Sequence, residues 1–412
     1  MKVLLWSQYF WPENFRINEL AAALQVGGMQ VTVLTGKPNY PQGVIFPGYS
    51  SIGIGHERYA GAQVVRVPLV PRGSGSPLRL ALNYLSFIVS GYVLAPFALR
   101  GQECDVVFVY APSPLLQALP AIFLARLKRA PLVLWVQDLW PESLLATGFV
   151  RNHWALKIVE AMVRYIYRHA DSILIQSEAF REPVARLAGD PRKIRYYPNT
   201  AEAVLDGSAT VRDSGLVSEL RRGFSVVFAG NIGAAQSMET ILAAAERLGP
   251  HSDIRFFVVG GGSRGGWLKQ EIGRRRLGNV LLPGPLPPAD MPAVFAAASA
   301  LLVTLGDAPA LALTIPSKLQ AYLAAGRPVI GSLNGEGARI VREAQAGFTC
   351  PAEDGEGLAA AVLRLYGLTP GERSRLGENG RRYFSQHFEP KKRVSELIEH
   401  FKDITAPARE DI

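Results

Sequence analysis

The stretch IPSKLQAYLAAGRPVI, residues 315–330, predicts one helix and the strand that follows it. Pro316 and Ser317 are typical of a helix start, and Gly326 is typical of the position just past a helix end. The apolar residues after Gly326 then predict a short buried strand. Helices that lead directly into buried strands are the repeating unit of parallel sheets, so a recurrence of this unit would predict an α/β fold.

The same alternation of apolar runs and helical segments recurs along the chain. Residues 2–6 and 105–110 are apolar runs of strand length, and segments of helical periodicity follow them at residues 15–26 and 115–128. Residues 224–230 begin a second series of the same kind. Strands alternating with helices predict an α/β fold with two Rossmann-like, doubly wound parallel sheets.

The length of the chain also favours two domains. A single hydrophobic core rarely serves 412 residues, and an apolar fraction of 48% is enough for two cores. We predict an N-terminal domain over residues 1–200 and a C-terminal domain over residues 223–390. Residues 201–222 are polar and lack a strong apolar period, which is typical of a linker. The last segment, residues 391–412, has a helical period that fits a place on either domain.

The net charge of +9 fits three classes of partner, namely nucleic acid, an anionic membrane surface and phosphorylated substrates. The basic residues are spread along the chain without a basic tail or an aromatic-interleaved groove motif, so we expect no nucleic-acid partner. Cys104 and Cys350 lie far apart in or beside apolar runs, which indicates reduced thiols and a cytoplasmic protein. The first residues are typical of a strand and not of an export signal.

An uncharged hydrophobic segment, residues 80–99, lies between Arg79 and Arg100. Its length would span a bilayer, but its polar residues and the strand that follows closely argue against a spanning helix. A buried core helix and a membrane-docking helix are equal alternatives for this segment.

Two glycine-rich loops follow strands of the second series. Ligands of doubly wound sheets bind beyond the carboxyl ends of the strands, which makes such loops candidate sites. In GNIGAAQS, Gly230 and Gly233 let the backbone approach a ligand, and Asn231 and Gln236 offer side-chain donors. An ordinary glycine-rich turn is the alternative that this motif leaves open.

The second loop, GGGSRGG, matches the spacing G-x-G-x-x-G through Gly260, Gly262 and Gly265. A nicotinamide site would use the first strand of its unit and an acid at the end of the next strand, and both are missing here. We therefore expect Gly260, Gly261 and Gly262 to give backbone lining for a nucleotide.

A single lysine, Lys318, stands at the helix start quoted first. The free N–H groups and partial positive charge of a helix N-terminus suit a phosphate, and Ser317 and Lys318 would add a hydroxyl and a cation. The sequence has no D-x-D pair and no cluster at metal-ligand spacing, so no metal is expected. Helix ends and Lys318 would then neutralise a departing diphosphate.

Polar residues follow two strands of the first series. In QDLWPES, Asp138 is a candidate to orient or deprotonate an acceptor hydroxyl, and Glu142 is a weaker one. Capping of the next helix is the alternative role for Asp138. In SQYFWPENFRIN, Glu13, Asn14 and Arg16 are expected at the same rim beside aromatic residues, a mixture that suits a sugar.

The ordered set GNIG, GGGSRGG, LPGPLPPADM and PSKLQAYLAAGRPVI resembles the nucleotide-sugar half of retaining GT-B glycosyltransferases of family four. The loops SQYFWPEN and LWVQDLWPES are similar to those of the L-fucosamine transferase subgroup of capsule and O-antigen assembly. The resemblance implies two Rossmann-like domains facing a central cleft, a UDP-sugar donor in the C-terminal domain and a final helix, residues 391–412, that returns to the first domain. Pro285, Leu286 and Pro316 would line the donor site.

On the acceptor side, the resemblance implies a lipid-linked or oligosaccharide acceptor in the N-terminal domain. It also implies a sugar such as an N-acetylhexosamine or L-FucNAc. The hydrophobic segment 80–99 and the positive charge favour a peripheral place on the cytoplasmic face of the inner membrane. No coenzyme is expected, because the nucleotide sugar is a substrate.

Departures from the family pattern narrow the candidate site. Leu313 and Ala321 stand where many members carry two glutamates that hold the donor, and the Arg and Lys expected after GNIG are absent. Lys318 is therefore the leading diphosphate ligand, with Gln236 and Ser317 as helpers, and Asp138 and Lys318 are the catalytic candidates. A nucleotide-sugar epimerase and a non-catalytic membrane-associated assembly module are the alternative functions.

Overall fold

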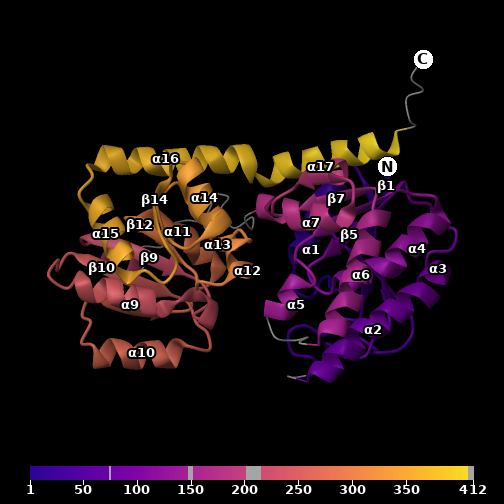
Figure 1. Ribbon diagram of the computed structural model, residues 1–412, viewed down its shortest axis with the longest axis horizontal. Helices are drawn as coiled ribbons and strands as arrows, with labels where there is room; N and C mark the ends of the chain where they lie inside the picture. Colours follow the sequence, from indigo (N-terminus) through magenta and orange to yellow (C-terminus); the bar gives the residue numbers. More distant parts are fainter. Residues whose placement is uncertain (74–75, 147–151, 201–214, 407–412) are drawn as a thin grey trace, which may run out of the picture. The chain divides into compact units, whose positions relative to one another are not determined.

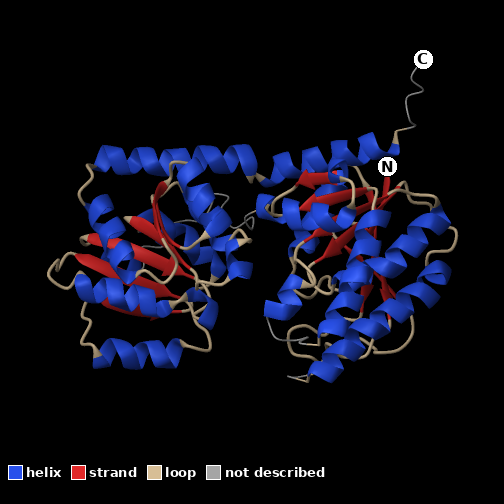
Figure 2. Cartoon of the chain, in the orientation of Figure 1, coloured by secondary structure: helices blue, strands red, loops and turns tan. Residues whose placement is uncertain are grey.

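The computed structural model describes residues 1–73, 76–146, 152–200 and 215–406, which form two compact units. Unit 1 comprises Met1–Tyr197 and Lys391–Ile412, and unit 2 comprises Pro198–Pro390. Within each unit, helices cover both faces of a central sheet, as Figures 1 and 2 show.

Unit 1 contains an eight-stranded sheet in the order β3-β4-β2-β1-β5-β6-β7-β8. Its strands are β1 (Lys2–Trp6), β2 (Gln30–Gly36), β3 (Gly55–Tyr59), β4 (Ala62–Val67), β5 (Val106–Ala111), β6 (Leu132–Val136), β7 (Ser172–Ile175) and β8 (Ile194–Tyr196). Its longer helices are α1 (Arg16–Val26), α2 (Pro77–Val93), α4 (Ala118–Lys128), α6 (His153–His169), α7 (Arg181–Ala188) and α17 (Pro390–Thr405), and α3 (Ala95–Ala98) and α5 (Glu142–Ala146) are short.

The central strands of unit 1 are parallel and buried on both faces, which explains their continuous apolar runs. The edge strand β3 is antiparallel to β4 and was not predicted. A two-residue turn joins the pair, with positive φ at Ala60 and Gly61, the conformation that suits the twist of a hairpin. The polar sequence of β3, GHERY, has only partly buried or exposed residues and therefore gives little apolar signal.

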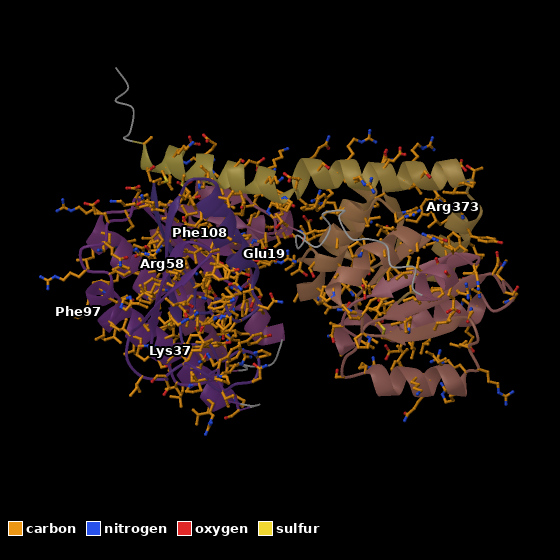
Figure 3. The ribbon with its side chains drawn as sticks, turned by 180° about the vertical axis from the view of Figure 1, so that it is seen from behind. Glu19, Lys37, Arg58, Phe97, Phe108 and Arg373 are labelled. Atoms are coloured by element: carbon orange, nitrogen blue, oxygen red, sulfur yellow. The ribbon has the colours of Figure 1, made fainter. Side chains whose placement is uncertain are left out.

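Helix α17 packs into the core of unit 1. Leu397, Ile398 and Phe401 are buried there, and the Phe401 ring lies edge-on to Phe108 with 5.4 Å between ring centroids (Figure 3 labels Phe108). His400 Nε2 and Ser172 Oγ are 2.8 Å apart in a buried hydrogen bond to β7. Of the predicted final segment, residues 407–412 lie outside the described part of the chain.

Unit 2 contains a six-stranded parallel sheet in the order β11-β10-β9-β12-β13-β14. Its strands are β9 (Phe224–Ala229), β10 (Ile254–Val259), β11 (Val280–Gly284), β12 (Ala300–Thr304), β13 (Val329–Ser332) and β14 (Gly347–Cys350). Its helices are α8 (Gly215–Leu220), α9 (Met238–Arg247), α10 (Gly265–Arg274), α11 (Met291–Ala297), α12 (Pro309–Ala312), α13 (Ser317–Ala325), α14 (Gly335–Glu343), α15 (Gly355–Tyr366) and α16 (Pro370–His387).

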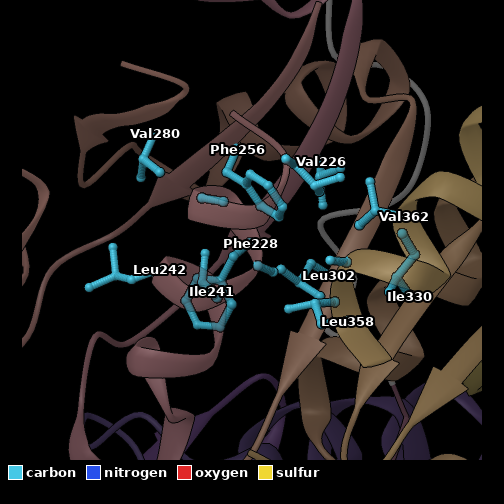
Figure 4. Packing of buried hydrophobic residues seen from close by; sticks show 14 of the residues in the cluster. Val226, Phe228, Ile241, Leu242, Phe256, Val280, Leu302, Ile330, Leu358 and Val362 are labelled. Carbon is cyan, nitrogen blue, oxygen red and sulfur yellow. The ribbon is translucent and has the colours of Figure 1, made fainter. Parts of the chain in front are cut away.

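One face of this sheet forms the core shown in Figure 4. Phe228 and Leu302 come from the sheet, Ile241 from α9 and Leu358 from α15, and all are at most 1% exposed. Helices α9 and α15 thus bury their apolar sides on the sheet, and this packing holds the carboxyl ends of the strands in place.

The predicted linker, residues 201–222, is only partly described, because residues 201–214 lie outside the described part of the chain. Its remaining part contains helix α8, whose Val217 and Leu220 are buried in unit 2. The boundary between the units falls between Tyr197 and Pro198.

Helix α2 contains most of the hydrophobic segment 80–99 and has two different faces. Ser76 Oγ accepts a 3.4 Å hydrogen bond from Arg79 N and caps the helix start. Phe87 and Gly91 point inward, and the Phe87 ring packs edge-on against Trp6. In the described ranges, we find no helix of the length and apolar character needed to cross a membrane.

Candidate functional site

The loop after β9 in unit 2 comes close to the lysine of α13. Ala229 N, at the end of β9, donates a 2.9 Å hydrogen bond to the hydroxyl of Tyr322 in α13, which fixes the helix against the strand. Gly230 has a φ of +140°, and a Cβ there would lie 3.2 Å from Lys318 Nζ. The positive φ favours glycine at this position, and a larger residue would also displace the end of the Lys318 side chain slightly.

The two glycine-rich loops are in direct backbone contact. Gly260 has a φ of +141°, and a Cβ there would lie 2.0 Å from the carbonyl oxygen of Gly230. Ile232 N donates a 2.8 Å hydrogen bond to Gly261 O, which joins the loops a second time. The structure thus brings together the two loops that the sequence singled out separately, beyond neighbouring strands β9 and β10.

Lys318 is the second residue of α13, and its ammonium is enclosed by uncharged groups. Nζ donates a 2.7 Å hydrogen bond to Gln236 Oε1 and lies 3.7 Å from the centroid of the Phe228 ring. Burial lowers the pKa of Lys318 to about 7. Among the described residues, no carboxylate forms an ion pair with Lys318, so the site can accept an anion that restores the charged lysine.

The other predicted donor-side residues lie next to Lys318 in the chain, in the two glycine loops, or after strand β11, the neighbour of β10. Pro316 is the N-cap residue of α13, and Ser317 is exposed in its first turn. Pro285 and Leu286 directly follow β11, next to the second glycine loop, because Gly260 N donates to Gly284 O at 2.9 Å. The remaining members, Asn231, Gly233 and Gly262, belong to the two glycine loops.

Three polar residues beyond the carboxyl ends of the unit 2 strands were not predicted from the sequence. Asp307, Asn334 and Glu353 follow β12, β13 and β14, which are neighbours in the sheet. Asn334 Nδ2 donates to Asp307 Oδ1 at 2.9 Å, and Asp307 N donates to Glu353 Oε1 at 3.2 Å. Each is a single polar residue in a loop without a motif, so only their position after neighbouring strands could have suggested them. Their oxygens can accept hydrogen bonds from hydroxyl groups.

In unit 1, Glu13 is buried and bonded to the backbone. Its side chain is 2% exposed; Oε1 accepts from Asn39 N at 2.8 Å and Tyr40 N at 2.7 Å, and Oε2 accepts from Phe10 N at 3.2 Å. Burial raises the pKa of Glu13 to about 7, against the opposing effect of these N–H donors. The carboxylate therefore joins the loop after β1 to the loop after β2.

Asp138 is held within its own loop. Its Oδ2 accepts from Trp140 Nε1 at 3.2 Å and from Ser143 Oγ at 3.0 Å, and its side chain is half-buried. Burial raises the pKa of Asp138, which makes its carboxylate a stronger base than an exposed aspartate. Glu142 begins α5 and pairs with Arg186 at 2.9 Å.

The remaining acceptor-side candidates lie beside an aromatic cluster. Asn14 is exposed, and Arg16 begins α1. The rings of Tyr9 and Phe15 stack with 5.0 Å between centroids, and Tyr40 contacts both. Such ring faces can pack against the apolar faces of a sugar.

An exposed apolar face covers four helices of unit 1. The side chains that form it are all exposed and come from α2, α3, α4 and α6: Leu78, Leu82, Leu85, Val89, Tyr92, Val93, Phe97, Phe123, Leu127, Trp154, Ile158, Met162 and Tyr165. The helices adjoin, because the Tyr92 and Phe123 ring centroids are 5.7 Å apart and Arg126 Nη1 donates to Tyr165 Oη at 3.4 Å. Phe97 lies at the outer edge of unit 1 in Figure 3.

Domain models of known families match both units. The Glycosyl transferase 4-like domain matches residues 14–200, and Glycosyl transferases group 1 matches residues 223–367. The chain is 27% identical over 348 residues to the colanic acid biosynthesis glycosyl transferase WcaI of Escherichia coli K12, covering 79% of this chain and 82% of WcaI. It is 24% identical over 247 residues to the teichuronic acid biosynthesis glycosyltransferase TuaH of Bacillus subtilis 168, covering 58% of each.

Solved structures share the fold over nearly the whole chain. HepE of Anabaena in complex with UDP and glucose matches with a TM-score of 0.67 and 18% identity, covering 98% of this chain and 99% of HepE. Sucrose-phosphate synthase of Thermosynechococcus elongatus matches with a TM-score of 0.72 and 17% identity, covering 98% and 99%. These matches confirm the predicted α/β fold class with two parallel-sheet units.

Proposed function

Because this chain is a glycosyltransferase with the GT-B fold, we propose that it transfers a sugar from a UDP-linked donor to a lipid-linked saccharide. The reaction would serve the assembly of a bacterial surface polysaccharide. The names of WcaI and TuaH support this context, and the UDP bound by HepE supports the nucleotide. For the sugar we propose an N-acetylhexosamine or a deoxyhexosamine such as L-FucNAc, on the resemblance of the N-terminal loops.

The proposal for the donor depends mainly on Lys318. The Lys318 ammonium, which contacts Gln236 and Phe228, has no counter-charge among the described residues, and it lies beside Gly230, where the absence of a side chain keeps the backbone accessible to a ligand. A diphosphate would supply that counter-charge and accept hydrogen bonds from the start of α13. The β-phosphate of UDP would therefore lie against Lys318 and the loop of Gly230.

In the proposed reaction, the bond between the anomeric carbon and the diphosphate oxygen breaks, and UDP leaves with the electron pair. An acceptor oxygen forms the new bond to the anomeric carbon, and Asp138 takes the proton of the acceptor hydroxyl. Lys318 and the N–H groups of α13 stabilise the charge on the leaving diphosphate without a metal. We propose retention at the anomeric carbon, on the family resemblance.

The exposed apolar face suggests where the enzyme binds its acceptor. Monomeric soluble proteins rarely expose large contiguous apolar patches, and basic side chains such as Arg79, Arg126 and Lys157 lie exposed beside this one. Apolar groups would enter the interface of the bilayer while the cations contact anionic head groups. We propose that this face docks on the cytoplasmic side of the inner membrane, where lipid-linked saccharides are accessible.

The proposed function is tested by incubating the protein with a panel of UDP-sugars, with and without lipid-linked saccharides. Release of UDP that requires an acceptor is expected, and NMR of the product should show the anomeric configuration of the donor. A new nucleotide sugar formed without acceptor would identify an epimerase instead. Absence of UDP release across the panel would favour a non-catalytic assembly module, and an inverted product would contradict retention.

A further inference from the structure

A cavity in unit 2 lies at the amino ends of the sheet strands, the opposite end of the sheet from Lys318. It has a volume of about 730 Å³, within the range of small-molecule sites. Phe224, Ser299 and Pro328 line it where β9, β12 and β13 begin. The glycine loops follow the carboxyl ends of the same sheet, so the cavity is separate from the proposed donor site.

Four arginines line this cavity: Arg221, Arg327, Arg373 and Arg381. Other arginines of unit 2, such as Arg255, Arg274 and Arg339, pair with glutamates. Among the described residues, none of the four forms an ion pair with a carboxylate. Two carboxylates, Asp253 and Glu378, also line the cavity, so its described lining has more positive than negative side chains.

Like charges are held together here by backbone contacts. Arg327 is half-buried and donates to Ala296 O, and Arg381 Nη2 donates to Ala325 O at 3.1 Å. Burial and the nearby charges of Arg381 and Arg221 lower the pKa of Arg327. A bound anion would relieve both the desolvation and the repulsion, and arginine forks match the oxygens of a phosphate.

Polar and aromatic groups complete the lining. Arg373, at the start of α16 and labelled in Figure 3, lies with its guanidinium carbon 5.4 Å from the centroid of the Phe224 ring. Asp253 accepts a 2.6 Å hydrogen bond from the hydroxyl of Tyr366, and Glu378 also lines the cavity. Carboxylates beside arginines suit a ligand that has hydroxyl groups as well as a phosphate.

We infer that this cavity is a second anion site, which binds a phosphate group independently of the transferred sugar. The phosphate could belong to a soluble phosphorylated molecule or to a lipid head group, and the chemistry of recognition is the same. Occupancy of this site would give the enzyme a means to sense a phosphorylated compound that it does not convert.

The test uses full-length Lys318→Ala protein, in which the proposed donor site is impaired, and inorganic pyrophosphate as the probe. Calorimetry should detect one binding site, weakened about tenfold by Arg381→Gln or Arg327→Gln, because each loses one charge-assisted contact. Arg375→Gln is the matched control, since Arg375 is exposed on the same helix and does not line the cavity. Arg381 is itself exposed, so Arg381→Gln keeps the test valid if Arg327→Gln impairs folding.

A second arm distinguishes the source of the phosphate. Sedimentation with phosphatidylcholine vesicles, with and without phosphatidylglycerol, is compared for Arg381→Gln and Arg375→Gln. Weaker phosphatidylglycerol-dependent binding in Arg381→Gln than in Arg375→Gln would assign the site to a lipid head group, and an effect on pyrophosphate alone would assign it to a soluble phosphate. If neither probe distinguishes Arg381→Gln from Arg375→Gln, the inference is wrong.

Discussion

Lys318 Nζ donates a 2.7 Å hydrogen bond to Gln236 Oε1, a neutral partner at the end of the first glycine loop of unit 2. A carboxylate at position 236 would neutralise the ammonium and compete with an anionic ligand. The amide instead orients Nζ and leaves its charge available. This hydrogen bond connects the first glycine loop to the start of α13, the two motifs predicted to bind the donor.

Binding of UDP should be coupled to proton uptake. In the free protein the pKa of Lys318 is lowered to about 7, and the nearby diphosphate should raise it, because an opposite charge favours the ammonium. Below about pH 7 the lysine is already charged, so this group adds no pH dependence there. Above that pH, UDP affinity should fall, and calorimetry in buffers of different ionisation enthalpy should detect up to one proton taken up. An unchanged proton count in Lys318→Ala would contradict the assignment.

Glu13 should be needed for the stability of unit 1. Glu13→Ala removes the acceptor of three backbone N–H groups, so the free energy of unfolding should fall by about 3 kcal/mol. Urea unfolding measures this loss. Asn14→Ala is the control, because Asn14 is exposed and should leave the stability unchanged. A stable Glu13→Ala protein with an increased KM for acceptor would instead make Glu13 an acceptor-binding residue.

His400 should make the attachment of α17 sensitive to acid. Burial, with a smaller effect of Arg195, lowers its pKa to about 4, below the usual 6.5. His400 therefore binds a proton more strongly in the unfolded chain than in the folded one. Its contribution to stability is retained above pH 6.5 and is lost as the pH falls, which lowers the free energy of unfolding by about 3 kcal/mol at pH 4. His400→Gln should show a shallower loss of unfolding free energy over this range.

The control for His400 is His251→Gln, since His251 is exposed in unit 2. The pKa of Glu13 is raised, so its contribution to the free energy of unfolding changes with pH in the opposite direction. Glu13 is present in both variants, so this contribution cancels in the comparison. Equal slopes for the two variants would show that His400 does not control the acid sensitivity.

The apolar face of unit 1 should bind anionic vesicles. Leu85 and Val89 are 55% and 59% exposed on α2, and a glutamate at either position would place a charge in the bilayer interface. Co-sedimentation should therefore weaken about tenfold in Leu85→Glu or Val89→Glu. Ile52→Glu is the matched control, because Ile52 is 77% exposed but lies outside the apolar face. Binding that is insensitive to salt and to both α2 variants would contradict membrane docking by this face.

The alternating architecture and the two glycine loops could be predicted from the sequence, for physical reasons. Central parallel strands are buried on both faces, so β5 and β9 appear as continuous apolar runs. The loops follow the ends of β9 and β10, and their contact follows from the pairing of those strands. The hairpin strand β3 was missed because its residues are only half-buried or exposed.

Side-chain partners were harder to predict than backbone positions. The sequence could place Glu13 at a loop, but it could not indicate that the carboxylate would accept from Asn39 and Tyr40 in another loop. It left the segment 80–99 undecided, because the exposed face of α2 becomes apparent only beside α4 and α6. Asp307 and Glu353 escaped notice because their relationship depends on the order of β12, β13 and β14.

The most direct test of the donor site is calorimetric titration of UDP into the wild-type protein, Lys318→Ala and Lys269→Ala. Lys269 is an exposed lysine of the same unit, on α10, so its variant has the same net charge as Lys318→Ala. We predict that Lys318→Ala weakens UDP binding at least about tenfold, because one charge-assisted contact to the diphosphate is lost, while Lys269→Ala binds as the wild type does. Equal affinity of the two variants for UDP would contradict the assignment of Lys318 to the diphosphate.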